Sequence, residues 1–335
     1  MKMKKEKKRK IKYWNIPILL ILGFLIQFFI MESYTLNIFI SIITALAFIF
    51  LGYYFWSKSF FNFFLFALTS LSLFISLEIS FNIGFYLNFL LSLIFSLIFS
   101  FICLKWKHNE NYPLLLLSSF IIIWIILGFN VLDRTDWILE NSINIPFIII
   151  AVLISKWFRF SKLSYSLFYL FMFMNVIGSH YTYSEVPFGF WLEGFLGLTR
   201  NHYDRIIHFC FGLLLAYPMR EVYVRIGNYK GFWALTAPIM MVIGLSAIYE
   251  LLEWGIAIIF GGDLGIAYLG SQGDVWDAQK DMFLAGIGSV ITMGITFLVL
   301  ISYKRKTLIS EIKESLKVKK QTPLGEVALE KIQKK

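Results

Sequence analysis

The side chains with the greatest capacity for chemistry lie between His180 and Asp281, where ionisable residues interrupt segments that otherwise have the composition of lipid-soluble helices. Asp204, Arg205 and His208 open one such segment, and the spacing of four places Asp204 and His208 on one helical face. A carboxylate beside an imidazole can hold the ring in one tautomer and raise its basicity, as a general base requires. The alternative is a carboxylate favoured by the helix dipole and a histidine bonded to a neighbouring helix.

Two glutamates, Glu250 and Glu253, lie three residues apart inside a long apolar stretch. An ionised carboxylate at membrane depth costs roughly 2.5 to 3.5 kcal/mol on insertion scales, so each needs a bound cation, a proton or a basic partner. The structural alternative is an ion pair with Arg205 or another basic group. Together with Asp204 and His208, the two glutamates are the candidate catalytic residues.

Three aspartates lead into the last apolar stretch: Asp274, Asp277 and Asp281 stand at positions i, i+3 and i+7. If a helix begins near Val275, they form one acidic stripe along its first two turns. That arrangement suits oxygen coordination of a hard cation such as Mg, Mn or Ca. The helix dipole also favours acidic residues in a first turn, which explains one aspartate more easily than three. We therefore predict a divalent-cation site at these residues, as the cofactor that the pattern allows.

Other polar residues of the region are candidates for substrate binding. Arg205 would hold an anionic group such as a phosphate. His180 could reach the same surface, although one histidine at a helix end is more often a satisfied interfacial residue. The remaining candidates are Glu185, His202, Gln272 and Trp276. The chain contains no phosphate-loop spacing, zinc-ligand spacing or dinucleotide fingerprint that would name a reaction.

The composition determines the class of protein that carries these residues. Hydrophobic residues make up 58% of the 335 residues and charged residues only 16%, with a mean hydropathy of +0.71. This excludes an ordinary soluble domain and predicts an all-α, polytopic bundle of transmembrane helices. A span needs roughly 20 apolar residues, and the chain offers about ten such windows. They lie near residues 14–32, 36–56, 60–78, 83–104, 113–131, 143–158, 164–181, 205–221, 231–260 and 281–302.

The basic residues predict the orientation of these spans. The formal net charge is +10, but 18 of the 31 Lys and Arg lie in residues 1–12 and 303–335. The intervening body is slightly acidic, so the basic tails predict contact with anionic membrane lipids and not with nucleic acid. The other basic loops fall on the same side as both tails, which predicts that both termini are cytoplasmic. The polar loops 180–204 and 261–280 then face the extracytoplasmic side.

Three regions follow from this pattern. Residues 1–112 hold the basic N-terminal tail and about four predicted spans, with little polar density. Residues 113–302 hold about six spans and every candidate site residue. Residues 303–335 form a basic cytoplasmic tail. The glycine-rich segment 185–198 carries two glutamates and is predicted to be re-entrant or interfacial.

Several stretches resemble the YjdF family of bacterial inner-membrane proteins, a family without an established activity. They are DWILEN at 136–141, HYTYSEVPFGFW at 180–191, NHYDRIIHFCFGLLLAYPMRE at 201–221, SAIYELLEWG at 246–255 and GGDLGIAYLGSQGDVWDAQKDM at 261–282. The resemblance covers roughly residues 113–302 and implies a location in the bacterial inner membrane. A fainter resemblance links the same acidic and His positions to VanZ-like proteins, which are associated with resistance to glycopeptide antibiotics.

The leading hypothesis is a polar, acidic pocket at the extracytoplasmic boundary that binds or processes a polar or lipid-linked small molecule. In an enzymatic version the acids bind a divalent cation, His208 acts as general base and Arg205 holds the anionic group. A second hypothesis is a proton-coupled transporter in which Glu250 and Glu253 exchange protons or bind the cargo. A third is a structural or stress-related protein in which the polar network only locks helices together.

Overall fold

The computed structural model describes residues 60–81, 91, 112–260, 271–319 and 324–334. Within these residues every regular element is a helix, and no strand is present. The chain forms two compact units: residues 1–204 with 261–272, and residues 205–260 with 273–335. The boundary between them falls inside the first turn of one continuous helix. The predicted all-helical class is thus confirmed.

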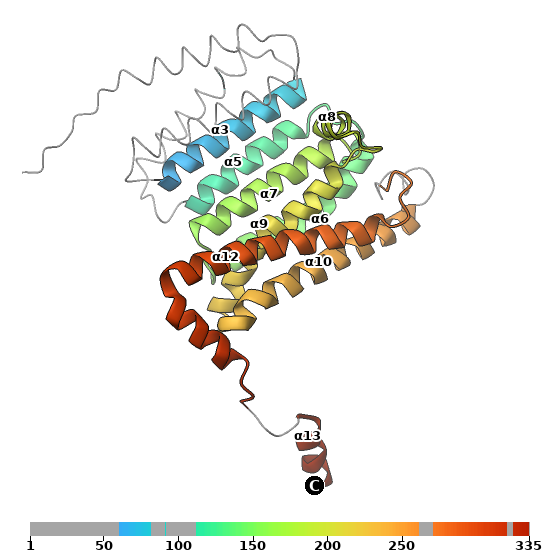
Figure 1. Cartoon of the computed structure of the whole chain (residues 1–335). Coiled ribbons are helices and arrows are strands. Elements are labelled where there is room, and N and C mark those ends of the chain that lie inside the picture. The colour runs from blue at the N-terminus through green and yellow to red at the C-terminus, as the bar shows by residue number, and fades with distance from the viewer. Residues whose placement is uncertain (1–59, 82–90, 92–111, 261–270, 320–323, 335) are drawn as a thin grey trace, which may run out of the picture. The chain divides into compact units, whose positions relative to one another are not determined.

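The first unit contains five described helices. They are α3 (Phe60–Phe81), α5 (Tyr112–Leu127), α6 (Arg134–Ile154), α7 (Lys162–His180) and the short α8 (Pro187–Leu196), labelled in Figure 1. Helices α3, α5 and α7 pack against one another, and α6 packs against α7. The predicted spans at 60–78, 113–131 and 164–181 correspond closely to α3, α5 and α7. The predicted spans at 14–32, 36–56 and 83–104 lie outside the described residues.

Small hydroxyl groups join the first three of these helices. The Tyr169 hydroxyl on α7 lies 2.8 Å from the Ser72 hydroxyl on α3 and 3.1 Å from the Ser119 hydroxyl on α5. All three side chains are buried. In an apolar surrounding such interhelical hydrogen bonds satisfy groups that water cannot reach, and small serines let the helices approach closely. The serines scattered through these apolar segments therefore contribute to packing.

Helix α6 begins earlier than the apolar pattern predicts. The Asp133 side chain accepts hydrogen bonds from the backbone N–H groups of Thr135 and Asp136, as an N-cap residue does. The stretch 133–140, which lies between the predicted spans at 113–131 and 143–158, is therefore mostly helical. Its polarity conceals the start of the helix from a hydropathy window.

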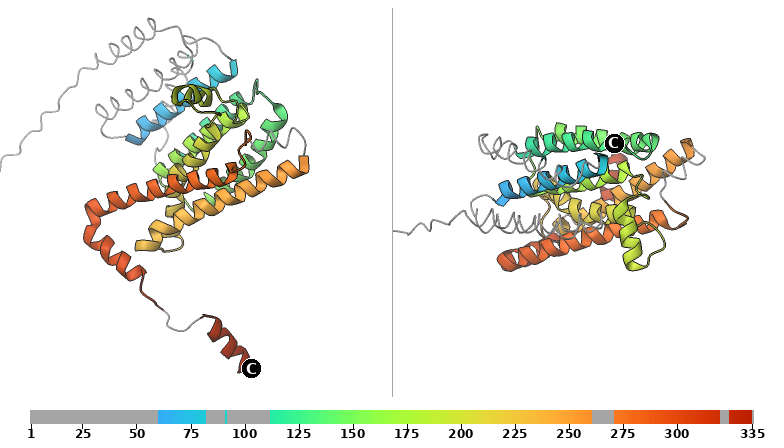
Figure 2. Two further views of the ribbon diagram at one scale, coloured as in Figure 1. Left: turned by 45° about the vertical axis from the view of Figure 1, so that its right-hand side comes forward. Right: turned by 90° about the horizontal axis from the view of Figure 1, so that it is seen from above.

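The second unit is formed by α9 (Tyr203–Arg225), α10 (Gly231–Phe260), α12 (Asp277–Ser315) and α13 (Leu324–Gln333). Helices α10 and α12 lie side by side (Figures 1 and 2). Helices α9 and α12 touch at two glycines. A Cβ atom on Gly212 would lie 1.9 Å from the Ala285 carbonyl oxygen, and one on Gly288 would lie 2.2 Å from the Phe209 carbonyl oxygen. The buried core beside this contact consists of Ala216, Val242, Ala285 and Met293.

Helix α12 continues well past the predicted end of its span at residue 302. Lys304 has φ −128° and ψ 30°, which interrupts the helical backbone and produces the bend visible in Figure 2. The helix then runs on to Ser315, so the first part of the predicted basic tail 303–335 is an ordered helical segment. Hydropathy could not reveal this continuation, because Lys and Arg are good helix formers in a polar environment.

Three described helices are long and apolar enough to cross a membrane: Arg134–Ile154, Gly231–Ile259 and Asp277–Ser315. Shorter apolar helices cover Leu71–Phe81 and Tyr112–Leu127. The described part of the chain therefore has the helix lengths and composition of a multi-pass membrane protein.

Candidate functional site

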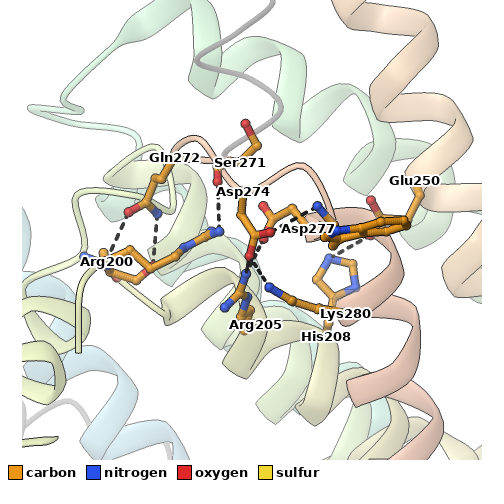
Figure 3. A network of polar contacts seen from close by, with 11 residues as sticks. Arg200, Arg205, His208, Glu250, Ser271, Gln272, Asp274, Asp277 and Lys280 are labelled. Atoms are coloured by element: carbon orange, nitrogen blue, oxygen red, sulfur yellow. Dashed lines mark hydrogen bonds and ion pairs between the residues drawn. The ribbon is translucent and has the colours of Figure 1, made fainter. Parts of the chain in front are cut away.

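Arg205, in the first turn of α9, is the centre of the polar network in the second unit. Its Nη2 donates to Asp274 Oδ2 at 2.5 Å and to Asp277 Oδ1 at 2.8 Å (Figure 3). Asp277 is the first residue of α12, and Asp274 lies just before it. The Arg205 and Asp277 side chains are only 13% and 8% exposed. Two aspartates predicted as metal ligands are thus engaged by a guanidinium group.

Asp274 receives two further hydrogen bonds. Lys280 Nζ on α12 donates to its Oδ2, and the Trp276 backbone N–H donates to its Oδ1 at 3.0 Å. The Lys280 hydrogen bond, followed by those from Trp276 and Arg205, holds the pKa of the Asp274 carboxyl far below its usual range. Asp274 is therefore ionised at any physiological pH and fixes the start of α12 against Arg205.

One helical turn beyond Arg205 is a second buried pair. His208 Nε2 lies 3.4 Å from Glu250 Oε1 on α10, and the two side chains are 7% and 11% exposed (Figure 3). The Tyr249 ring packs edge-on against the imidazole, with the ring centroids 5.7 Å apart. Glu253, one turn further along α10, is also buried. Imidazole and carboxylate can exchange a proton at this distance with a small adjustment of either side chain.

A third acid meets the same histidine. One ring nitrogen of His208 lies within 4.8 Å of a carboxylate oxygen of Asp281, which is 2% exposed. Asp204 lies one helical turn before His208 in α9, so helix geometry directs its carboxylate toward the same face. An imidazole nitrogen and a carboxylate oxygen, as His208 and Asp281 offer, are donors found for divalent metals such as Zn and Mn. The arrangement differs from the aspartate stripe that the spacing predicts.

Within the first unit, a separate set of hydrogen bonds joins residues 200–201 to residues 271–272. Arg200 Nη1 donates to the Ser271 carbonyl oxygen at 2.9 Å. The Asn201 N–H donates to Gln272 Oε1 at 3.1 Å, and Gln272 Nε2 donates back to the Asn201 carbonyl oxygen at 3.0 Å (Figure 3). Gln272 has a positive φ of 46°. This predicted substrate-binding residue therefore has a clear role in holding two chain segments together.

Asn201 was not among the predicted site residues, yet it is 1% exposed and makes several contacts. Its Oδ1 accepts from the Tyr203 N–H two residues on, as in an Asx-turn, just before α9. Its Nδ2 donates to the Val186 carbonyl oxygen at 2.9 Å, next to α8. An Asn just before an acidic helix start was the available sequence signal. Arg200 was also missed, because its partner Ser271 lies 71 residues away in the sequence, and so was Lys280, whose partner Asp274 lies six residues before it.

The other predicted substrate-binding residues have different surroundings. His180 is 2% exposed, with Nδ1 2.8 Å from the Leu127 carbonyl oxygen and the Tyr181 ring packed edge-on against it. Glu185 is exposed, and His202 is partly buried. Trp276 is 62% exposed. The geometry gives His180 the bonded environment of a structural residue, whereas Trp276 presents a large surface to the exterior.

Comparison with known proteins gives two matches. Residues 112–302 match a family of predicted membrane proteins, DUF2238. Over 189 residues the chain is 36% identical to inner membrane protein YjdF of Escherichia coli (strain K12), an alignment that covers 54% of this chain and 88% of the relative. No solved structure matches. The resemblance to the YjdF family is thereby confirmed, whereas the fainter one to VanZ-like proteins stays a prediction.

The matched region contains all the polar residues described above, together with the helices that carry them. The apolar helices and the family agree on a multi-pass protein of the cell membrane. By the extent of the match, the chain belongs to the DUF2238 family of predicted membrane proteins, with YjdF as a relative.

Proposed function

We propose that the second unit binds a polar or lipid-linked small molecule at the centre formed by Arg205, His208 and Glu250, assisted by a divalent cation. The observation that carries this proposal is the burial of the His208–Glu250 pair, 7% and 11% exposed, where α9 meets the apolar helix α10. Burying ionisable groups in apolar surroundings costs free energy that apolar side chains would not cost. Such groups are concentrated at functional sites.

In this proposal His208 and Asp281 would hold the cation. Asp274 and Asp277 are poorer candidates than the sequence pattern suggests, because Arg205 already engages both carboxylates. A cation at His208 and Asp281 would supply Lewis-acid activation or polarise a phosphate oxygen. Arg205, fixed by its two aspartates, would orient an anionic group of the ligand, since guanidinium binds phosphate and carboxylate with a defined geometry.

The protein residues have distinct tasks in this scheme. Because His208 would hold the cation, Glu250 would accept the proton from a bound hydroxyl or water, in place of the general-base role predicted for His208. Glu253 supplies a second buried carboxylate on α10. We place this centre at the extracytoplasmic boundary of a bundle of about ten spans with both termini cytoplasmic, in agreement with the positive-inside rule.

The proposal is tested by the metal content of the protein purified in mild detergent. We expect near-stoichiometric divalent metal in the wild type, loss of metal in Asp281→Asn, and retention in Asp274→Asn, because only the first removes a proposed ligand. Glu314→Gln, an exposed acid on the distal part of α12, is the matched control. Metal that is absent from the folded wild type, or equally retained in Asp281→Asn, would contradict the cation site.

The buried His208–Glu250 pair also supports a second function, proton-coupled transport. A carboxylate and an imidazole in contact can take up and release one proton as each becomes accessible to solvent. Accessibility separates the two functions: cysteines introduced at positions 250 and 253 should react with a polar thiol reagent from both sides in a transporter. In the binding or enzymatic function we expect reaction from one side only.

A further inference from the structure

The opposite end of the second unit contains a cavity that the proposed function does not use. Its volume is about 220 Å³, larger than a single water needs. It is partly open and is lined by the second half of α9, the connection to α10, the start of α10 and the part of α12 around the bend. Its polar lining consists of Arg220, Tyr229, Lys230, Lys304, Thr307 and Glu311.

The backbone holds this cavity in a defined shape. Gly231 has a positive φ of 54°, and a Cβ atom there would lie 2.2 Å from the Glu311 carbonyl oxygen. The Phe232 N–H donates to Ser315 Oγ at 3.0 Å, and Trp233 Nε1 donates to the Ser315 carbonyl oxygen at 2.9 Å. The bend at Lys304 therefore directs the distal part of α12 against the start of α10. The cavity is thus formed by a fixed junction.

The charge of the lining selects an anion. The cationic side chains of Arg220, Lys230 and Lys304 line the cavity, together with one acid, Glu311. Among the described residues, none of these three side chains forms an ion pair with an acid. Arg220 Nε is buried and has no hydrogen-bond partner in the described part of the chain. The N-terminus of α10, a helix of 30 residues, begins at the cavity and adds a partial positive charge. A buried guanidinium donor requires an acceptor.

The surroundings of the cavity indicate where that acceptor resides. Phe232 and Trp233, at the start of the candidate span Gly231–Ile259, are 38% and 51% exposed, and Tyr303, beside the bend of α12, is 62% exposed. Aromatic residues at such positions lie at the level of lipid headgroups. The remaining lining residues, including Val224, Leu235 and Leu300, are apolar. Basic pockets between helices on the cytoplasmic side suit the phosphate groups of anionic lipids.

We propose that this cavity binds a phosphate group, with Arg220 donating to its oxygens and Lys230 and Lys304 neutralising its charge. A phosphodiester of an anionic lipid and a small dissolved phosphate share this chemistry. The site is independent of the metal-assisted centre near His208, so each can exist without the other.

The test uses full-length protein in a zwitterionic detergent and follows thermal unfolding with added short-chain lipids. We expect dioctanoyl phosphatidylglycerol to raise the unfolding temperature and dioctanoyl phosphatidylcholine, which has no net charge, to have little effect. Arg220→Gln should weaken phosphatidylglycerol binding by roughly ten- to a hundredfold, the effect of losing one charge-assisted hydrogen bond. The double variant Lys230→Gln/Lys304→Gln should weaken it without removing a buried side chain.

Lys306→Gln is the matched control, because Lys306 is exposed on the same helical segment and does not line the cavity. If inorganic phosphate stabilises the wild type as well as phosphatidylglycerol does, the ligand is a dissolved phosphate. If only the lipid acts, the ligand is a headgroup. Equal stabilisation by phosphatidylcholine, or unchanged phosphatidylglycerol affinity in the double variant, would overturn the proposal.

Discussion

The two ends of the second unit are both built from α9, α10 and α12, but acidic side chains predominate at one end and basic side chains at the other. At one end, Arg205 pairs with Asp274 and Asp277, and His208 pairs with Glu250, so these ionisable groups find their partners within the protein. At the other end, Arg220, Lys230 and Lys304 face a cavity with one acid. His208 and Arg220 lie on the same helix, separated by a rise of about 18 Å. This rise is shorter than the hydrocarbon core of a bilayer, which is about 30 Å thick, so the two groups lie at different depths of one helix.

At the acidic end the ionisable groups pair with one another, whereas at the basic end the cationic groups face a cavity. In the acidic end, removal of one partner leaves a buried charge that the fold has to accommodate. In the basic end, the charges are nearer to solvent and a ligand completes the network. We therefore expect substitutions at the acidic end to change stability, and substitutions at the basic end to change ligand binding more than stability.

The largest effect should come from Arg205→Ala. This change removes the cation from Asp277, which is only 8% exposed, and should destabilise the protein by about 3 kcal/mol, the lower end for breaking a buried ion pair. Thermal unfolding in detergent measures the loss. Lys280→Ala is the matched control, since Lys280 pairs with the same acidic turn but is 48% exposed. An equally small effect of both substitutions would show that the acidic end is not a closed network.

Next in size is Gly288→Ala, which disturbs the contact that holds both ends together. The added methyl group would lie 2.2 Å from the Phe209 carbonyl oxygen, and forcing α9 from α12 should cost roughly 1 to 3 kcal/mol. Gly294→Ala, on the same helix with open space around it, should be neutral or slightly stabilising. For both variants, the unfolding temperature is measured and, as a test of the proposed centre, the metal content. Equal behaviour of the two glycines would refute the close helix contact.

Gly231→Ala should affect the basic end selectively. The substitution places a side chain at a positive φ and against the Glu311 carbonyl oxygen, at a cost of about 1 to 3 kcal/mol. Because the bend of α12 must shift, binding of dioctanoyl phosphatidylglycerol should weaken while metal content stays unchanged. Gly244→Ala, on the same helix with no atom within 4 Å, is the control. Loss of metal in Gly231→Ala would show that the two ends are coupled.

The smallest effect concerns the pH dependence of the acidic end. The Asp274 pKa lies below its ordinary value of 3.8, so its stabilising contribution is present above that value and is lost as the pH falls through the lower folded-state pKa. The difference in unfolding temperature between wild type and Asp274→Asn should stay constant from pH 7 to pH 5 and diminish below pH 4. A difference that already disappears near pH 6 would contradict an ionised, hydrogen-bonded Asp274.

Much of the candidate site was predictable from local sequence. Asp204 and His208 share a helix face because they are four residues apart, and the polar run at residues 270–282 marks the start of α12. The metal ligands Asp274, Asp277 and Asp281 were predicted from a local aspartate stripe and stay a prediction, while the structure shows Arg205 bonded to the first two. Arg205 lies 69 and 72 residues from the aspartates that it binds, so no local pattern could identify those pairs.

The sequence by itself determined the helical class, the membrane environment and the location of the ionisable residues, because hydropathy and charge are properties of short segments in contact with lipid or water. Only the tertiary structure decided which acid meets which cation, and that Gly212 and Gly288 bring α9 against α12. Only it revealed the basic cavity at the bend of α12. These features depend on contacts between helices far apart in the chain, which form when packing brings the helices together.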